Sequence, residues 1–382
     1  MKNCYAFRRV SRRLGPSIAA VTESLERHTP SVLVTEEPSQ APRELHRKLP
    51  SYEVTPLVRA EATGLGALWV KDESSRLGLP SFKILGASWA ILRALEQRLG
   101  DIGPWSHIDE LAARLAAHGP LALAAATDGN HGRAVARMAS LLGLRALIYV
   151  PEGTASARIE AVESEGAACE VVPGGYDDAV RRSAEQASEH CLVISDTSWP
   201  GYEEVPAWVI EGYSTIFWEI EDQLERTPDV VVVQMGVGAL AAAAVRHYRR
   251  SGLDPRPYLI GVEPQDAACV LASARAGEIT TLTGAQHSIM AGLNCGTPSR
   301  VAWPLVSEGM DAYLAIPDER AEEAMRLLAA VGLVSGETGA AGMGGMLELL
   351  AADQARLEGA QVLVLSTEGA TDPVAYERVV QS

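Results

Sequence analysis

The sequence lacks several features that would each point to a class of protein. Aromatic residues make up only 5% of the 382 residues. No apolar stretch is long enough to cross a bilayer, so a membrane-spanning helix is not expected. The net charge of -16 argues against a nucleic-acid partner, because binding to phosphate backbones needs clustered Lys and Arg. The five cysteines show no short paired spacing: they are Cys4, Cys169, Cys191, Cys269 and Cys295. Neither a zinc site nor a dense disulfide framework is therefore indicated, and we expect no bound metal.

The first residues also lack the apolar run of a secretory signal. The segment MKNCYAFRRVSRRLG is basic, but Glu23 and Glu26 follow too soon for a transit peptide. Residues up to about Leu49 are polar and show no strong period. We therefore expect an accessory N-terminal extension over residues 1–49 and a cytoplasmic protein.

Beyond this segment, short apolar runs alternate with helical runs, which predicts an α/β fold with mostly parallel sheets and helices on both faces. The expected helices begin near residue 82 and after residue 238, and cover 132–142 and 156–165. The expected strands are 67–71, 121–126, 146–150, 169–172, 192–195, 230–234, 258–262, 312–316 and 361–365. We expect a large domain, 50–86 and 198–382, with a smaller domain, 87–197, inserted in it.

The first chemical motif is Pro80–Lys83, at the start of an expected helix. The positive end of a helix dipole disfavours the charge of a lysine there, and a neutral amine is the nucleophile that Schiff-base chemistry needs. Taken alone, Lys83 is more readily read as a solvated lysine.

The second motif is Ala125–Arg133, at a junction between a strand and a helix. Its two glycines permit a tight turn, and its small polar side chains lie where α/β proteins bind ligands, at the carboxyl ends of parallel strands. The structural alternative is an Asn-Gly turn in which Asp128 caps the helix.

The third motif is Met235–Ala239, which follows an apolar strand and opens an Ala-rich helix. Backbone N–H groups at a helix N-terminus bind phosphate. The spacing of a dinucleotide fingerprint and the Lys-Ser/Thr of a P-loop are missing, so NAD and ATP are disfavoured. A pair of glycines needed only for packing is the alternative.

In this order, the three motifs resemble the fold-type II, tryptophan-synthase-β-like, pyridoxal-phosphate enzymes. Within that family the chain is most similar to the diaminopropionate ammonia-lyases, and the likeness runs from about Ser51 to Asp372. It also rests on the stretches at 175–179, 196–199, 201–206, 210–213, 290–296, 335–340 and 366–372.

The resemblance implies a role for each matching residue. Lys83 would hold pyridoxal 5'-phosphate as a Schiff base and act as a base at the substrate's Cα, with Asp128 as a second base on the opposite face. Asn130 would hydrogen-bond the cofactor's O3′, and Ser366, or failing it Thr367, would face its pyridine nitrogen. The backbone of Gly236, Val237, Gly238 and Ala239 would hold the phosphate, Glu337 would lie near the cofactor, and the substrate pocket would include Asp196, Tyr176, His131 and Ser81.

The resemblance further implies a homodimer that eliminates ammonia from 2,3-diaminopropionate, or a close derivative, and yields pyruvate and ammonia. Carboxylates such as Asp128 and Asp196 suit a β-ammonium group, because a buried charge must be paired. Members of the family can carry a cysteine pair at the stretches of Cys269 and Cys295, although reduced thiols are favoured in a cytoplasmic protein.

Three alternatives remain open on the sequence. A serine or threonine dehydratase, or a biosynthetic relative that acts on another β-substituted amino acid, would share the cofactor, and Pro80, Ile84 and Trp89 depart from the family pattern beside the expected pocket. A regulatory protein that keeps the fold is disfavoured by the intact Lys83 and Asn130. A nucleotide-binding oxidoreductase is disfavoured by the missing fingerprint.

Overall fold

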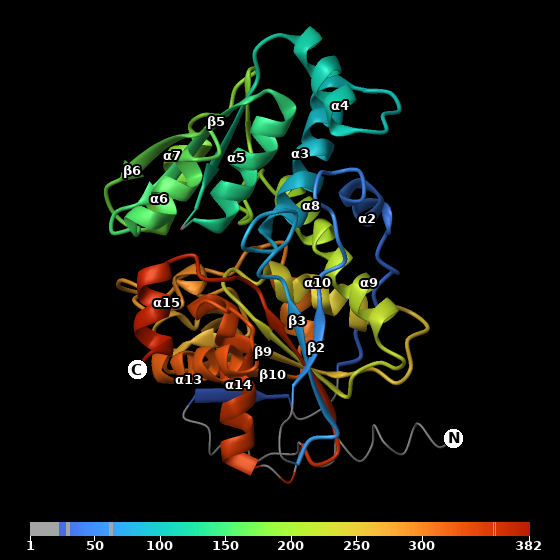
Figure 1. Ribbon diagram of the computed structural model, residues 1–382, viewed down its shortest axis with the longest axis vertical. Helices are drawn as coiled ribbons and strands as arrows, with labels where there is room; N and C mark the ends of the chain where they lie inside the picture. The colour runs from blue at the N-terminus through green and yellow to red at the C-terminus, as the bar shows by residue number, and fades with distance from the viewer. Residues whose placement is uncertain (1–22, 28–30, 61–63, 128, 354, 356) are drawn as a thin grey trace. The chain divides into compact units, whose positions relative to one another are not determined.

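A computed structural model describes residues 23–27, 31–60, 64–127, 129–353, 355 and 357–382. They form two compact units (Figure 1). Unit 1 comprises the described residues up to Pro38, Val54–Ser74 and Ile216–Ser382, and unit 2 comprises Ser39–Glu53 and Ser75–Thr215. Within the described residues, no helix is long and apolar enough to cross a membrane.

Unit 2 is built on a four-stranded sheet in which every pairing is parallel, in the order β6-β5-β4-β7. Its strands are β4 (Ala122–Ala126), β5 (Arg145–Pro151), β6 (Ala168–Val172) and β7 (Cys191–Val193). Its helices are α2 (Ala41–His46), α3 (Lys83–Leu99), α4 (Ile108–Leu115), α5 (Asn130–Leu142), α6 (Ser156–Glu163), α7 (Tyr176–Ala184) and α8 (Glu204–Gly212), with a 3₁₀ turn, η2, at Ala116–His118.

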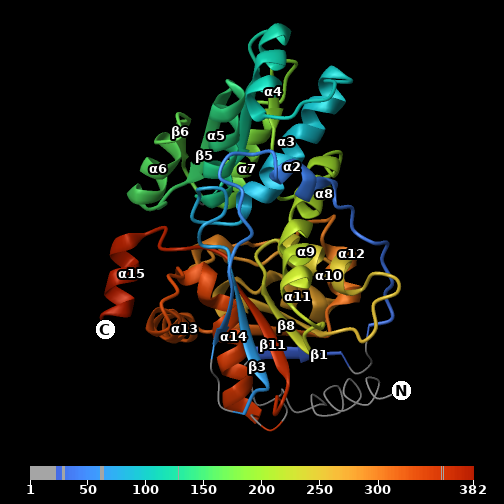
Figure 2. The same ribbon diagram turned by 45° about the vertical axis from the view of Figure 1, so that its right-hand side comes forward.

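Helices α5 and α7 cover opposite faces of this sheet. Tyr149 points to the face where Ala179 of α7 is buried, and the neighbouring Ile148 lies against Gly132 of α5. Successive residues of a strand point to opposite faces, so the continuous apolar runs of β4 and β5 are those of strands buried on both sides. Figure 2 shows this sheet and its helices from a second direction.

Helices α3 and α8 pack so closely that two glycines are needed at the contact. A Cβ on Gly212 would lie 2.4 Å from the carbonyl oxygen of Leu85, and a Cβ on Gly86 would lie 2.6 Å from the ring of Tyr213. Both helices therefore belong to unit 2. The domain boundaries expected from the sequence divided these helices, with 50–86 and 198–382 in the large domain and 87–197 in the small one. A contact between helices that are distant in the sequence leaves no local pattern from which to predict it.

Unit 1 contains a seven-stranded sheet in the order β1-β10-β9-β8-β11-β3-β2. Only the outermost strands, β1 and β2, pair antiparallel. The strands are β1 (Glu23–Glu26), β2 (Leu57–Ala60), β3 (Ala67–Asp72), β8 (Val230–Gln234), β9 (Tyr258–Pro264), β10 (Ala312–Ile316) and β11 (Gln361–Ser366). The helices are α9 (Ser214–Gln223), α10 (Ala239–Tyr248), α11 (Cys269–Ala276), α12 (Trp303–Gly309), α13 (Asp318–Ala330), α14 (Glu337–Asp353) and α15 (Pro373–Val380), with 3₁₀ turns η3 (Gln265–Ala267) and η4 (Ala291–Leu293).

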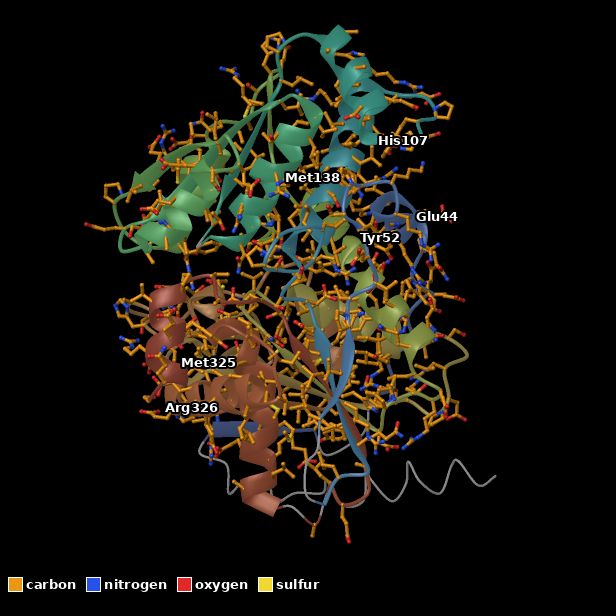
Figure 3. The ribbon with its side chains drawn as sticks, viewed as in Figure 1. Glu44, Tyr52, His107, Met138, Met325 and Arg326 are labelled. Carbon is orange, nitrogen blue, oxygen red and sulfur yellow. The ribbon has the colours of Figure 1, made fainter. Side chains whose placement is uncertain are left out.

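Helices cover both faces of this sheet as well. Val232 and Val262 point to the face where Met325 of α13 is buried. Val231 and Val233 are equally buried and point to the other face, where α10 packs on β8. Figure 3 labels Met325 and its neighbour Arg326, whose guanidinium instead donates at the surface to the carbonyl oxygen of Val379, 3.3 Å away.

The α/β class and every strand expected from the sequence are present. The strands without a signal in the sequence are β1 and β2, which are short edge strands. The segment expected as an N-terminal extension, 1–49, is divided where it is described: β1 pairs with β10 in unit 1, and α2 packs on α3 in unit 2. The first 22 residues lie outside the described part.

A buried ion pair joins β3 to α9 in unit 1. The Lys71 ammonium lies 2.8 Å from the Glu219 carboxylate, and both side chains are 0% exposed. The same ammonium donates to the carbonyl oxygen of Thr55 at 2.8 Å and to the side-chain oxygen of Gln223 at 2.9 Å. A buried charge is tolerated when it is paired and hydrogen-bonded in this way.

We expect Lys71→Met to lower the free energy of unfolding by about 3–5 kcal/mol, because it leaves the Glu219 carboxylate buried without its cation. The double variant Lys71→Met/Glu219→Leu removes both charges and should recover much of that loss. Urea unfolding of the three proteins measures the difference. A double variant as unstable as the single one would show that the two charges are not coupled.

Candidate functional site

Lys83 is the first residue of α3, and its amine is held by a buried carboxylate of unit 2. The Lys83 ammonium lies 2.6 Å from Oδ2 of Asp196, whose side chain is 7% exposed, against 21% for Lys83. Tyr176, the first residue of α7, donates its hydroxyl to Oδ1 of the same carboxylate at 3.1 Å. Ser81 is buried and its hydroxyl accepts the backbone N–H of Lys83 at 3.4 Å. Four residues expected from the sequence are thus brought together.

The electrostatics of this cluster keep Asp196 ionised. Burial would raise the pKa of Asp196, but the positive charge of Lys83, followed by that of His131, acts in the opposite direction. Hydrogen bonds from Lys83 and Tyr176 add to this effect, and the pKa of the Asp196 carboxyl lies well below its usual range.

The ion pair changes the expectation for Lys83. From the sequence, the helix N-terminus alone was expected to disfavour the charged amine. A carboxylate at 2.6 Å instead stabilises the ammonium form of Lys83. Only the fold reveals this pairing, because the two residues are 113 positions apart.

The turn before α5 is shaped by its glycines. Gly129 has φ 145° and occupies the N-cap position, and its N–H donates to the Thr127 hydroxyl at 2.8 Å. A Cβ on Gly132 would lie 2.3 Å from the Thr127 methyl group, so the helix starts as close to the strand as a residue without a side chain permits. Asn130 is the first residue of α5 and is half-buried at this turn.

His131 is buried, and its Nε2 donates to the carbonyl oxygen of Ile194 at 2.8 Å. This bond ties the start of α5 to the segment that carries Asp196. Asp128 lies outside the described residues, and its roles as second base or helix cap stay predictions.

The loop after β8 in unit 1 has the form of an anion-binding cradle. Gly238 has φ 93° and is the N-cap residue of α10. Among the described residues, the backbone N–H groups of Gly236, Val237, Gly238 and Ala239 have no protein acceptor. A Cβ on Gly236 would lie 3.1 Å from the sulfur of Cys295 and 3.2 Å from the carbonyl oxygen of Gly292. Unfilled donors at a helix N-terminus bind a phosphate or a similar anion.

The other cofactor-binding residues expected from the sequence meet near the carboxyl ends of β8 and β11, which are neighbouring parallel strands. Ser366 is buried and its hydroxyl donates to that of Ser335 at 2.8 Å. The N–H of Gly336, next to Glu337, donates to the carbonyl oxygen of Glu368 at 3.0 Å. The segment that begins α14 therefore lies against the segment that ends β11.

Gln234, the last residue of β8, holds these segments together and was not identified from the sequence. Its amide nitrogen lies 2.9 Å from the Thr367 hydroxyl and 3.1 Å from the carbonyl oxygen of Leu365. The carbonyl oxygens of Thr338 and Gly339 are 3.2 and 3.1 Å away. The sequence did contain a signal, a glutamine at the end of an apolar strand, because a buried amide needs several hydrogen-bond partners.

Cys269 and Cys295 both lie beside Gly236. The thiol of Cys269 is 3.8 Å from the carbonyl oxygen of Gly236, and the sulfur of Cys295 is the closest atom to a Cβ built there. Both are thiols in the structure.

Comparisons with known proteins extend the likeness over most of the chain. Residues 48–368 match the family described as "Pyridoxal-phosphate dependent enzyme". A diaminopropionate ammonia-lyase of Salmonella typhimurium is 37% identical over 365 residues, which cover 88% of this chain and 90% of the relative. The Escherichia coli K12 relative of that name is 35% identical over 378 residues, covering 92% of this chain and 93% of its own. The crystal structure of the Escherichia coli enzyme in complex with D-serine matches with a TM-score of 0.83 at 33% identity, covering 94% of this chain and 96% of that one.

The depressed pKa of Asp196 predicts how stability depends on pH. The carboxyl titrates near 3.8 in the unfolded chain and lower in the folded one, so its charge stabilises the fold above pH 3.8 and the contribution is lost as the pH falls through the folded pKa. The stability difference between wild type and Asp196→Asn should be constant above about pH 5 and shrink below pH 3.8.

Thermal unfolding of the cofactor-free proteins between pH 3 and 7 tests this. Glu189→Gln, which changes an exposed carboxylate in unit 2, serves as the control and should change the free energy of unfolding by less than about 0.5 kcal/mol. A difference for Asp196→Asn that grows as the pH falls would contradict the assignment.

Proposed function

Since this chain belongs to the family of pyridoxal-phosphate dependent enzymes, we propose that it eliminates the β-amino group of 2,3-diaminopropionate, or of a close derivative, and yields pyruvate and ammonia. The observation that carries the proposal is the buried Asp196 carboxylate 2.6 Å from the Lys83 amine. A substrate with two amino groups brings the cation that a carboxylate in this position pairs with. The relatives of similar length are named diaminopropionate ammonia-lyases, which supports the same substrate.

The residues present fit pyridoxal phosphate. The cofactor carries an aldehyde, which a lysine amine attacks, and a phosphate, which unfilled backbone donors bind. Lys83 supplies the amine, and the loop Gly236–Ala239 supplies donors without a protein acceptor in the described part of the chain. When bound, the cofactor withdraws electrons from the substrate's Cα and so makes its proton acidic.

The roles proposed for the chain's own residues follow from their contacts. Asp196, held by the Tyr176 hydroxyl, would bind the substrate's β-ammonium, and the substrate's α-amine would free Lys83 from the cofactor. The neutral Lys83 amine would then take the Cα proton as a general base. His131 and Ser81 would keep Asp196 and Lys83 in place through their backbone contacts.

Around the cofactor, Asn130 would contact O3′, and Ser366 or Thr367 would face the pyridine nitrogen, with Glu337 nearby. The neutral hydroxyls favour elimination, because they leave the ring less electron-withdrawing than a carboxylate partner would. The second base, Asp128, and a homodimer rest on the family resemblance, and we propose a cytoplasmic location as well.

The alternative is a serine or threonine dehydratase, in which a hydroxyl group leaves. The Asp196 carboxylate disfavours it, because a neutral hydroxyl would leave that charge without a cation once Lys83 has moved. A panel of D- and L-diaminopropionate, L-serine and L-threonine, with pyruvate or 2-oxobutyrate and ammonia measured, distinguishes the two. We expect the diaminopropionates to have a kcat/KM at least about a hundredfold higher. Equal or faster turnover of L-serine or L-threonine would overturn the proposed substrate.

Lys83→Ala should lose turnover and the visible absorbance of the cofactor-bound enzyme, while far-UV circular dichroism stays that of the wild type. The control is Lys48→Ala, which removes an exposed lysine of unit 2. Borohydride reduction followed by peptide mapping identifies the labelled lysine. Specific labelling of another lysine in Lys83→Ala would show that the amine is misassigned.

The Gly236–Ala239 cradle predicts a graded loss of cofactor affinity. Gly236→Ala places a Cβ at 3.1–3.2 Å from its neighbours, which a small shift accommodates, whereas Gly236→Val adds methyl groups where the Cys295 sulfur and the Gly292 carbonyl lie. We expect the Kd for pyridoxal phosphate to rise by less than tenfold for Ala and by more than about tenfold for Val. Fluorescence titration measures the Kd of both variants. An unchanged Kd for Gly236→Val would contradict the assignment of the cofactor's phosphate to this loop.

A further inference from the structure

Strand β7, which leads to Asp196, is an edge strand of the unit 2 sheet and is hydrogen-bonded to β4 on one side. Among the described residues, no strand pairs with its other side. Successive residues of a strand direct their N–H and C=O groups to alternate sides, and the N–H of Ile194 donates to the carbonyl oxygen of Ala124 in β4 at 2.8 Å. The C=O of Val193 and the N–H of Ser195 therefore point to the unpaired side, as such groups do on edge strands.

The hydroxyl of Tyr202 binds both of these backbone groups. It donates to the carbonyl oxygen of Val193 at 2.7 Å and accepts the N–H of Ser195 at 3.0 Å. A residue of a neighbouring parallel strand would bond to the same pair of groups. One hydroxyl thus completes the edge of β7 in place of a strand. Burial raises its pKa, so it keeps the proton that it donates.

The ring of Tyr202 is held as well as its hydroxyl. It stacks on the ring of Trp199, with centroids 4.1 Å apart and an interplanar angle of 10°. Its backbone N–H donates to the carbonyl oxygen of Trp199 at 2.9 Å. Both rings pack against the apolar core of unit 2 that includes Val193. The loop from Ser195 to Tyr202 is therefore closed at its base by the hydroxyl and supported by the two rings.

Asp196 is the first residue of this loop beyond the two hydrogen bonds of Tyr202. Its carboxylate lies 2.6 Å from the Lys83 ammonium. On the other side of the strand, His131 donates to the carbonyl oxygen of Ile194 at 2.8 Å. The backbone that leads to Asp196 is thus held by two side chains, Tyr202 at the outer edge and His131 at the start of α5.

We propose that Tyr202 is a positioning residue for Asp196, and that it thereby determines which β-substituent the site accepts. It acts through the backbone of Val193 and Ser195, which fixes where the carboxylate lies. The inference rests on the proposed function, in which Asp196 pairs with the β-ammonium of the substrate. Tyr202 belongs to the stretch 201–206, which contributed to the family resemblance but received no role from it.

Tyr202→Phe removes the hydroxyl and keeps the ring that stacks on Trp199, so two backbone groups lose their partner. The matched control is Tyr313→Phe in unit 1. Tyr313 is buried, and its hydroxyl likewise donates to a backbone carbonyl, that of Val306 at 2.8 Å. We expect both variants to keep the far-UV circular dichroism of the wild type and to lower the melting temperature by about 2–4 °C.

The first measurement uses the cofactor-free proteins at neutral pH and needs no turnover. Asp196→Asn is introduced into the wild type, Tyr202→Phe and Tyr313→Phe, and the melting temperature of each protein is compared with that of its parent. A carboxylate that is no longer held at Lys83 has less stability to lose. We therefore expect Asp196→Asn to lower the melting temperature in Tyr202→Phe by at most about half as much as in the wild type, and in Tyr313→Phe by the same amount as in the wild type. An equal decrease in all three backgrounds would overturn the inference.

The second measurement is the ratio of kcat/KM for diaminopropionate to kcat/KM for L-serine. A misplaced carboxylate weakens the contact with the β-ammonium, a group that serine lacks. We expect Tyr202→Phe to lower this ratio by about tenfold, chiefly through a higher KM for diaminopropionate, and Tyr313→Phe to keep the wild-type ratio. A wild-type ratio in Tyr202→Phe, with both substrates slowed alike, would show that the hydroxyl only maintains the fold. An enzyme inactive on every diaminopropionate would refute the proposed function, while the thermal cycle still decides the role of Tyr202.

Discussion

The ion pair between Lys83 and Asp196 is the interaction around which the polar residues of unit 2 gather. It places a buried carboxylate 2.6 Å from an amine at the start of a helix, and a buried charge of this kind is stable only while it has a counterion. In this structure the Lys83 amine is therefore held as an ammonium. Under the proposed function, Lys83 leaves Asp196 to bind the cofactor, and the second amino group of the substrate supplies the cation that the carboxylate then needs, which a hydroxy amino acid does not.

The partners of Asp196 come from elements that are distant in the sequence. Tyr176 begins α7, Lys83 begins α3, and His131, in the first turn of α5, binds the carbonyl oxygen of Ile194 two residues before Asp196. In a parallel α/β unit, helix N-termini and the carboxyl ends of strands lie at the same edge of the sheet. The fold therefore concentrates positive helix ends and polar side chains around one carboxylate.

In unit 1 as well, the carboxyl ends of parallel strands and the helix N-termini share one edge of the sheet. Strands β8 and β11 are parallel neighbours, so the loop after β8 and the residues that follow β11 share an edge. Gln234 joins the two segments to the start of α14 through one amide nitrogen. Glycines at 236 and 336 allow backbone to approach backbone or sulfur, as Gly86 and Gly212 do in unit 2. In both units, residues without a side chain decide how closely the functional segments approach one another.

The sequence by itself determined the class of fold and the order of its motifs. Apolar runs such as Val230–Gln234 identify buried parallel strands because such strands have no polar face. The loop at 236–239 was noticed because it follows such a strand and opens a helix, whereas Lys83 received its role only from the family resemblance. The edge strands β1 and β2, the packing of α3 on α8, and the amide of Gln234 left no comparable signal. Only the tertiary structure decided that Asp196 holds Lys83, and that the Tyr213 hydroxyl is buried without a partner among the described residues. Both findings depend on contacts between residues more than a hundred positions apart in the chain.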